Sequence, residues 1–469
     1  MFAVFIITAL TNYSYNIAMG WLLTPEQYGT LGVSISFLLI LSLFTSNAFP
    51  LTVSKFISAK YDLNTKHKIF KSSLVANLCF AFIITSLFYT AYQVQLINLE
   101  EKYNLYISVV IFAILVSSIA IIYSSLLQGT FRFKAYGLIG VVGTLTKLIS
   151  GVGFVVLGFG ALGALFAIPL GTLVALLINL VLARDFKFWK TKGFADLSMY
   201  FFAIPTFFGT LSMTLLMNMD LLGVKFLTLS DLESGYYRAV LILAQLPLFV
   251  AGSIVSVMFP YISRHGTENN KYAEKTIKYT VLFILPVSLS IAIIPKSFIA
   301  LLFPKEYMVG ADALRVIAIG IGFLVIIQVL TYIFQARHKP RIPAIVLMCA
   351  VVVSGIALYS LIPRYGIVGA ATSTTIACAF GLTGLSYAYK PKVKIAEVIK
   401  TLIAYAVFGF FIYLIPHYSR VLTLVDLGVS GMVYLVALLV LGLVREEDVR
   451  IILSGVLPED TINKVLKLV

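Results

Sequence analysis

The stretch Gly160-Ala-Leu-Gly163-Ala has a counterpart in Gly366-Ile-Val-Gly369-Ala, 206 residues further along the chain. Two other pairs of segments keep almost the same separation. Tyr28-Gly29 matches Ser234-Gly235 at 206 residues, and Gln128-Gly129 matches Gln335-Ala336 at 207. A separation that stays nearly constant along the chain indicates that one unit has been duplicated.

The segments around these repeats are apolar enough to cross a membrane many times. Of the 469 residues, 60% are hydrophobic and 12% are charged, whereas about a quarter of the residues in soluble domains are charged. This composition excludes an ordinary water-soluble enzyme. Because a transmembrane helix needs about 20 apolar residues, the apolar windows predict fourteen spans, at residues 1–23, 31–53, 73–97, 105–127, 138–158, 161–183, 199–221, 237–258, 279–302, 313–335, 344–362, 367–389, 400–416 and 422–443.

The basic residues indicate how the chain crosses the membrane. The 35 Lys and Arg residues outnumber the 20 Asp and Glu residues and give a net charge of +15. They fall between the spans, so the excess does not indicate a nucleic-acid partner. With the N-terminus in the cytoplasm, 26 basic residues lie on the inner side, eight on the outer side and Lys147 within a span. Because cytoplasmic loops carry such an excess, we expect a plasma-membrane protein with both termini in the cytoplasm.

The repeat and the span count together predict the architecture. A unit of six spans returns the chain to the same side of the membrane, so two copies are related by a pseudo-two-fold axis along the membrane normal. We therefore expect an all-α polytopic membrane protein with two six-helix lobes, at residues 1–183 and 199–389, joined by a cytoplasmic linker at 184–198. Two additional spans lie within residues 390–443, and residues 444–469 form a cytoplasmic tail.

Five segments carry a resemblance to a known family: Gly20-Trp-Leu-Leu-Thr-Pro-Glu-Gln-Tyr-Gly29, Asp220-Leu-Leu-Gly223, Gly235-Tyr-Tyr-Arg-Ala239, Leu301-Leu-Phe-Pro-Lys-Glu-Tyr307 and Arg364-Tyr-Gly-Ile-Val-Gly-Ala370. In their order and spacing the chain resembles the polysaccharide (oligosaccharide) flippases of the multidrug/oligosaccharidyl-lipid/polysaccharide exporter superfamily. The resemblance implies a transporter that moves a lipid-linked oligosaccharide from the cytoplasmic to the outer leaflet by alternating access. It also implies H⁺ or Na⁺ as the coupling ion and contact with membrane lipids, and we expect a monomer.

Lys147 is the first candidate for a substrate-binding residue. It is the tenth residue of the span at 138–158 and so lies near the bilayer centre, where an unpaired ammonium group costs several kcal/mol. One interpretation is a cation that meets a lipid pyrophosphate or a sugar acid in a central cavity. The other is a lysine that pairs with a neighbouring helix.

Amide side chains form a second candidate set. Asn12 and Asn16 lie four residues apart in the first span, and Asn218 lies in the first span of the second lobe. Side chains at this spacing share one helix face, and such a stripe could line a hydrated, sugar-binding cleft. Hydrogen bonding between helices, worth about 1 kcal/mol for each bond, is the interpretation that we favour.

Asp220 and a basic cluster complete the candidates. Asp220, near the outer end of the seventh span, is either a protonatable coupling site or an interfacial carboxylate that pairs with Lys225 or Arg238, and we favour the second interpretation. Three basic residues at the inner side could capture phosphate, although such clusters more often set topology or contact anionic lipids; they are Arg337, Lys339 and Arg341.

Two other functions are alternatives to the flippase. A membrane-embedded glycosyltransferase or polymerase needs acidic residues in a large outer loop, but the first outer loop has about six residues and no Asp-x-Asp occurs. A cation-coupled drug antiporter needs a well-buried carboxylate, for which Asp220 is the candidate. The chain has no phosphate-binding Gly-rich loop, and its three cysteines have neither disulfide nor zinc-site spacing. We therefore predict no catalytic residue, metal or cofactor.

Overall fold

The chain folds into helices whose bounds differ by several residues from the expected spans. The computed structural model describes residues 2–444 except 60–61, 98, 187, 189–190, 192, 197–199, 201–203, 249–250, 252–270, 338, 391–394 and 415–419. The first half contains α1 (Phe2–Leu22), α2 (Pro25–Ser46), α3 (Ala48–Ser58), α4 (Leu63–Gln93), α5 (Tyr103–Gly129), α6 (Phe133–Phe154) and α7 (Gly160–Leu182). The second half contains α8 (Ile204–Thr228), α9 (Asp231–Ala244), α11 (Lys271–Tyr279), α12 (Leu285–Ile293), α13 (Pro295–Leu302), α14 (Ala311–Ala336), α15 (Arg341–Tyr389), α16 (Ile395–Leu414) and α17 (Arg420–Val440).

The all-helical membrane fold is confirmed. Within the described residues no strand occurs, and ten helical segments are long and apolar enough to cross a membrane. Two of these segments, Phe133–Leu182 and Arg341–Tyr389, each contain two of the expected spans. The total of fourteen spans stays a prediction, and the tail after residue 444 and part of the span at 237–258 lie outside the described residues.

The glycine stretch that reveals the repeat makes the same tight turn in both halves. Gly160 has φ 53° and ψ −144°, and Gly366 has φ 54° and ψ −133°. L side chains rarely adopt a positive φ, so glycine is required at both turns. The second glycine of each stretch lies where the two helices touch: a Cβ on Gly163 would be 2.8 Å from Phe154 Cβ, and one on Gly369 would be 2.3 Å from the Leu361 carbonyl oxygen.

In the first helical hairpin of each half, the second helix begins in the same way. Thr24 caps α2 by accepting a hydrogen bond from the Gln27 amide at 3.3 Å, and Ser230 caps α9 by accepting one from the Glu233 amide at 3.2 Å. Such caps satisfy backbone amides that the helix leaves without partners. Thr24 and Ser230 are again 206 residues apart, so local structure repeats along with sequence.

The two halves meet where α2 crosses α9. A Cβ on Gly29 would lie 2.0 Å from the Asp231 carbonyl oxygen, and a Cβ on Gly235 would lie 1.8 Å from the Pro25 carbonyl oxygen. Pro25 corresponds to Asp231 in the repeat just as Gly29 corresponds to Gly235, so the contact is reciprocal. A two-fold axis requires such reciprocity, and only glycine lets the backbones approach this closely.

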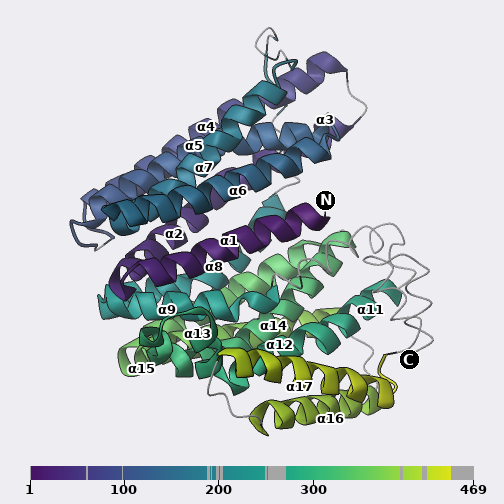
Figure 1. Cartoon of the computed structure of the whole chain (residues 1–469). Helices are drawn as coiled ribbons and strands as arrows, with labels where there is room; N and C mark the ends of the chain where they lie inside the picture. The colour runs from purple at the N-terminus through teal and green to yellow at the C-terminus, as the bar shows by residue number, and fades with distance from the viewer. Residues whose placement is uncertain are drawn as a thin grey trace.

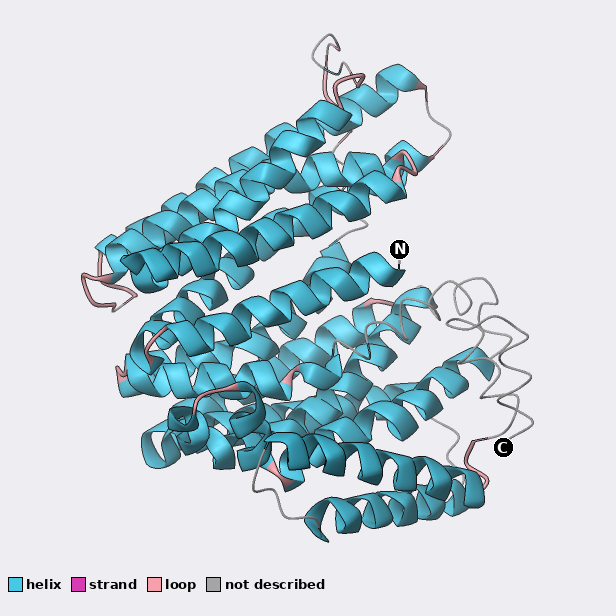
Figure 2. Cartoon of the chain, in the orientation of Figure 1, coloured by secondary structure: helices cyan, strands magenta, loops and turns pink. Residues whose placement is uncertain are grey.

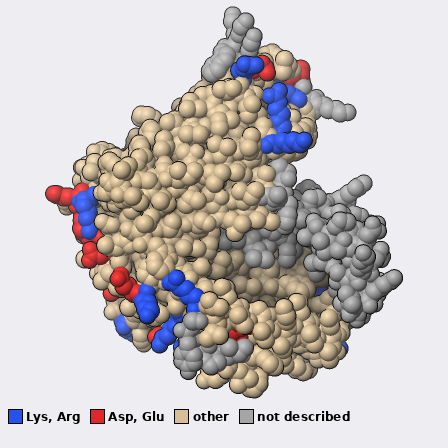
Figure 3. Space-filling model, in the orientation of Figure 1, with Lys and Arg blue, Asp and Glu red and all other residues tan. Residues whose placement is uncertain are grey.

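Figure 1 shows the helices α3 to α7 as an upper bundle and α8 to α17 as a lower group, with α1 and α2 between them. The two groups converge on the left, at the α2–α9 crossing, which we call the closed end, and diverge on the right, at the N-terminus, which we call the open end. Loops gather mostly at these two ends (Figure 2). Figure 3 shows charged residues at the ends, a broad uncharged flank between them, and a hollow at the open end between the upper bundle and the lower helices.

Candidate functional site

Lys147 of α6 points to the first helix. Its Nζ atom donates a hydrogen bond to Asn12 Oδ1 of α1 and lies 4.5 Å from the centre of the Tyr15 ring. Tyr15 is held in place because its hydroxyl donates to the Ala164 carbonyl oxygen at 2.7 Å. Since α6 begins at Phe133, Lys147 is the fifteenth of its 22 residues. Lys147 as a whole is half-buried, and its ammonium group combines a hydrogen bond to Asn12 with a cation–π contact to Tyr15.

Asn16 connects this lysine to a second cation. Its Nδ2 atom donates to the Asn12 carbonyl oxygen at 2.9 Å, and its Oδ1 atom accepts a hydrogen bond from Arg238 at 3.0 Å. Arg238 lies in α9 of the other half, so this bond crosses between the lobes. A run of polar contacts therefore leads from Lys147 through the two asparagines to Arg238.

Arg238 is a candidate site residue that the sequence analysis does not single out, because it stands among the outer-side basic residues. Arg238 belongs to α9, and its side chain is buried between helices, with only 6% of its surface exposed. Gly32 of α2 leaves room for it, since a Cβ there would lie 2.9 Å from Arg238 Cγ. In the described part of the chain Arg238 forms no ion pair with a carboxylate. Its hydrogen-bond partners, Asn16 and Tyr28, are neutral, while the charge of the buried Asp220 carboxylate acts on it without forming an ion pair. A guanidinium without an ion-paired carboxylate is able to bind an anion. Its position as the second residue of the expected span 237–258 was the signal that could have found it.

The structure does not bring Asn218 into this group. Asn218 is only 6% exposed, and its Nδ2 atom donates to the Thr214 carbonyl oxygen one turn earlier in α8, at 2.9 Å. Asn12 makes the corresponding bond to Thr8 at 2.9 Å. The amide spacing is thus part of the repeat, but the described contacts connect only the stripe on α1 to the cations.

Asp220 lies in the core of the second half and not at the membrane interface as expected. Among the described ion pairs it has none with Lys225 or Arg238, although its charge acts on Arg238. The carboxylate is completely buried. One oxygen accepts hydrogen bonds from the Tyr237 hydroxyl at 2.9 Å and the Thr374 hydroxyl at 3.1 Å, and the other accepts from the Leu221 amide at 2.8 Å. Three donors from α8, α9 and α15 therefore surround a carboxylate that has no basic partner among the described ion pairs.

Lys225 belongs instead to an ion cluster at the closed end, made by Glu100, Lys102, Lys225 and Asp231. Lys225 Nζ lies 3.0 Å from Glu100 and 2.9 Å from Asp231, and Lys102 Nζ lies 2.8 Å from Glu100 and 2.6 Å from Asp231. The Tyr103 hydroxyl also donates to Asp231 at 2.5 Å. Glu100 and Lys102 precede α5, whereas Lys225 and Asp231 belong to α8 and α9, so the closed-end ion cluster joins the two lobes. Hydrogen bonds from Lys102 and Lys225 hold the pKa of the Glu100 carboxyl below its ordinary value.

We expect the Lys225→Met substitution to loosen the closed end. The substitution leaves the Glu100 and Asp231 carboxylates with Lys102 as their shared partner. Removing one partner from the buried Asp231 carboxylate is destabilising. Spin labels at the exposed positions Glu101 and Leu232 should then report longer distances across the closed end. The matched control is Lys296→Met, which removes an exposed lysine outside the cluster.

Acid should have a similar effect on the wild type. A lowered pKa stabilises the closed end at neutral pH, and this stabilisation is lost as the pH falls through the pKa of Glu100. In Lys225→Met the loss should begin at a higher pH, because one of the two donors that lower this pKa is gone. Distances that stay unchanged in both variants at all pH values would contradict a role for the cluster in holding the lobes together.

The inner basic residues lie apart from this site, in the connection between α14 and α15. Arg337 follows the end of α14 and stacks on the Tyr389 ring, with its guanidinium carbon 5.1 Å from the ring centre. Lys339 and Arg341 are exposed. These three basic residues stand at the open end. As for a metal site, no group of His, Cys, Asp and Glu side chains among the described residues could hold a metal ion.

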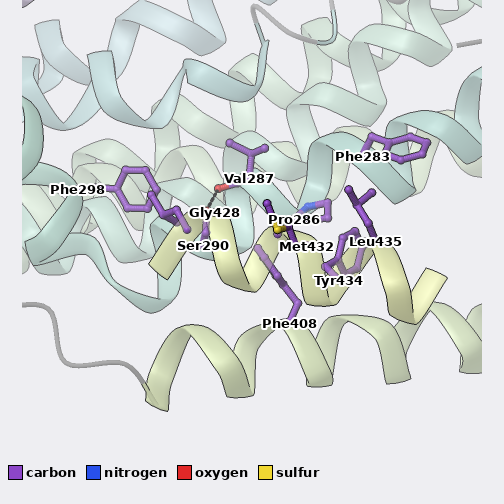
Figure 4. Close-up of a pocket in the computed structure, with 12 residues that line it drawn as sticks. Phe283, Pro286, Val287, Ser290, Phe298, Phe408, Gly428, Met432, Tyr434 and Leu435 are labelled. Atoms are coloured by element: carbon purple, nitrogen blue, oxygen red, sulfur yellow. Dashed lines mark hydrogen bonds between the residues drawn. The ribbon is translucent and has the colours of Figure 1, made fainter. Parts of the chain in front are cut away.

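An apolar pocket lies beside the second half, between α12–α13 and the α16–α17 pair. Its volume is about 550 Å³. Figure 4 shows Phe283, Val287 and Phe298 on one wall, facing Phe408 and Met432. Ser290 also lines the pocket, but its hydroxyl donates to the Val287 carbonyl oxygen at 2.8 Å. The walls therefore offer hydrocarbon contacts and little hydrogen bonding.

Two pseudo-symmetric helical lobes, closed together at one end and connected by a buried arginine, define the two-lobed fold that is found in membrane transporters. Among solved structures, the chain is similar to the lipid II flippase MurJ in an inward closed conformation, with a TM-score of 0.73, 15% identity, and coverage of 93% of this chain and 97% of that one. It is also similar to an inward-facing multidrug resistance MATE family transporter of the MOP superfamily, with a TM-score of 0.61, 16% identity, and coverage of 82% and 96%. These similarities establish the fold.

The chain belongs to the polysaccharide biosynthesis protein family, whose model matches residues 1–265. A curated relative, the uncharacterized membrane protein MJ1068 of Methanocaldococcus jannaschii, is 28% identical over 131 residues. That alignment covers 27% of this chain and 26% of the relative, so the chain spans about a quarter of the relative's length. The expected resemblance to a polysaccharide biosynthesis family is confirmed by this match, and the expected two-lobed fold by the similarity to MurJ and MATE structures.

Proposed function

We propose that this protein transports a lipid-linked oligosaccharide or polysaccharide precursor from the cytoplasmic to the outer leaflet of the plasma membrane. The observation that carries the proposal is the polar run from Lys147 to Arg238, which connects two cations across the contact between α1 and α9. A diphosphate that links a lipid to a glycan is an anion that needs such partners inside a membrane. The family, whose members are described as polysaccharide biosynthesis proteins, and the MurJ-like fold support this choice of substrate.

The lobes are proposed to work by alternating access. With both termini in the cytoplasm, the open end faces inward and the closed end faces the outer leaflet. The substrate then enters between the lobes at the open end, and its phosphates reach Lys147 and Arg238. Release requires the α2–α9 crossing and the closed-end ion cluster to separate. Arg337, Lys339 and Arg341, at the open end, are proposed to attract the anionic headgroup before it enters.

The apolar pocket supports a substrate with a lipid anchor. A hydrocarbon chain needs a surface without competing polar groups, and the walls contributed by Phe283, Phe298 and Phe408 meet this requirement. We propose that the amide stripe of Asn12 and Asn16 contacts the polar part of the same substrate. Asn218, which is buried on its own helix, is proposed to pack the second lobe instead.

Asp220 is proposed as the coupling residue. A buried carboxylate that accepts three hydrogen bonds and lacks a basic partner among the described ion pairs is able to exchange H⁺ or Na⁺. The MATE fold supports this role, and it also favours the second candidate function, a cation-coupled drug antiporter. The two cations at the lobe interface favour the flippase, because a cationic drug would be repelled by them.

Liposomes containing the purified protein test the proposal. We expect the protein to move a polyprenyl diphosphate that carries a glycan between the leaflets, measured by the accessibility of the glycan to an external lectin or enzyme. Protein-free liposomes give the background rate. Liposomes that exchange cationic drugs for protons and do not move the glycolipid would establish the antiporter instead.

A further inference from the structure

Four aromatic residues pack together at the contact between the two lobes, next to the polar run that connects Lys147 to Arg238. Tyr28 comes from α2, Tyr236 from α9, and Phe303 and Tyr307 from the segment between α13 and α14. We call them the closed-end aromatic cluster. The Tyr307 ring centre lies 5.9 Å from that of Tyr28, 6.0 Å from that of Tyr236 and 5.5 Å from that of Phe303. Tyr307 is therefore the centre of the cluster.

The cluster divides between the two lobes. Tyr28 belongs to the first half, whereas the other three residues belong to the second. Tyr28, Phe303 and Tyr307 are each at most 1% exposed in the described conformation. Because Tyr28 and its two neighbours Phe303 and Tyr307 stand on different lobes, a separation of the lobes at this end would expose their ring surfaces to the space between the lobes.

The hydroxyl of Tyr307 is buried in the closed state. It has no hydrogen-bond partner among the described residues. A buried polar group without a partner destabilises the state that contains it, whereas phenylalanine would fill the same space without that cost. Three of the four residues are tyrosines, although an apolar interface needs no hydroxyl groups. The hydroxyl therefore indicates a partner that is present in another conformation.

The cluster continues the polar run of the cation site. The Tyr28 hydroxyl donates to the Asn16 carbonyl oxygen at 3.1 Å, and Asn16 is the partner of Arg238. A substrate whose diphosphate lies at Lys147 and Arg238 would thus place its next group at Tyr28 and Tyr307. In a lipid-linked glycan that group is the first sugar, which offers an apolar ring face for an aromatic side chain and hydroxyls for the tyrosines.

We propose that the closed-end aromatic cluster is a sugar-binding subsite that forms when the lobes part, and that it binds the sugar attached directly to the diphosphate. This inference rests on the proposed function. It assigns Tyr307 a contact with the substrate, and it explains why a tyrosine rather than a phenylalanine stands at the centre of an interface that is buried in the closed state.

Binding measurements with two probes test the inference. One probe is a short-chain polyprenyl diphosphate, and the other is the same lipid carrying one N-acetylglucosamine. We expect the wild type to bind the sugar-bearing probe about tenfold more tightly. Tyr307→Leu should lose this preference while its affinity for the bare diphosphate stays within twofold. The matched control is Tyr359→Leu, which changes a tyrosine that is 75% exposed on α15.

Tyr307→Phe separates the hydroxyl from the ring. We expect this variant to retain part of the preference for the sugar and to unfold at a temperature about 2 °C higher, because it removes a buried group without a partner. An equal loss of affinity for both probes in Tyr307→Leu, or a wild type without preference for the sugar, would overturn the inference. A wild type that binds neither probe would overturn the proposed function itself.

Discussion

The Lys147→Met variant is expected to lose glycolipid transport by about 100-fold while its amount in the membrane stays normal. Methionine fills a similar volume but removes the charge, so the diphosphate loses one of its two cationic partners. Hydrogen bonds to charged groups contribute about 1.5–3 kcal/mol each, and each 1.4 kcal/mol corresponds to about tenfold. The rate in liposomes that contain equal amounts of each protein is the measurement.

Two further substitutions test whether the loss of transport is due to the charge at position 147. Lys134→Met removes an exposed lysine near the start of the same helix, and we expect it to transport at the rate of the wild type. Lys147→Arg keeps the charge and should retain part of the activity, although the larger guanidinium has to fit beside Tyr15. If Lys147→Met transports normally, the bond to Asn12 only packs α6 against α1, and the substrate site must be sought elsewhere.

Much of the fold could be predicted because the duplication leaves marks that depend on backbone geometry. A turn with positive φ needs glycine, so Gly160 and Gly366 appear at equivalent positions in the sequence. A crossing of two backbones needs glycine as well, and Gly29 and Gly235 mark it. The helix bounds were less predictable: α2 begins at Pro25, six residues before the expected span, because the Thr24 cap and not hydropathy starts it.

The candidate site was only partly predictable, because its decisive contacts join residues far apart in the sequence. Lys147 and the asparagines were recognised since a charge or an amide in an apolar helix is conspicuous. Arg238 was not, because a basic residue near the end of a span resembles an ordinary topology signal. The tertiary fold buries it: Gly32 allows α9 to approach α2, and this approach places the guanidinium against Asn16.

The same limit explains the error at Asp220. Lys225 lies five residues away in the sequence and looks like a suitable partner. On a helix, however, a separation of five residues turns the side chains away from each other. Lys225 therefore faces Glu100 and Asp231 at the lobe interface, while Asp220 faces the core of its own lobe. Hydropathy alone does not distinguish these two faces.

The Asp220→Asn variant is expected to lose acceleration of transport by an imposed H⁺ or Na⁺ gradient. Asparagine has nearly the same shape and keeps an oxygen for the Tyr237 and Thr374 hydroxyls, but it neither binds a proton at neutral pH nor neutralises Na⁺. Its amide nitrogen replaces the oxygen that accepts from the Leu221 amide, so this one hydrogen bond is lost. The gradient should speed the wild type at least tenfold and leave the variant at its rate without a gradient. Liposomes loaded to give one gradient at a time identify the ion.

The design separates coupling from folding and from substrate binding. Asp312→Asn is the matched control, because Asp312 is exposed at the start of α14 and pairs only with Arg315 among the described ion pairs. Without a gradient, Asp220→Asn should still exchange glycolipid between leaflets, since Lys147 and Arg238 are intact. A variant that keeps the full gradient response would show that the buried carboxylate holds α8, α9 and α15 together and that the driving ion acts elsewhere. A loss of response that leaves equilibrium exchange intact shows that the lost hydrogen bond to the Leu221 amide does not disrupt the transport path, and it assigns the gradient response to the Asp220 carboxylate.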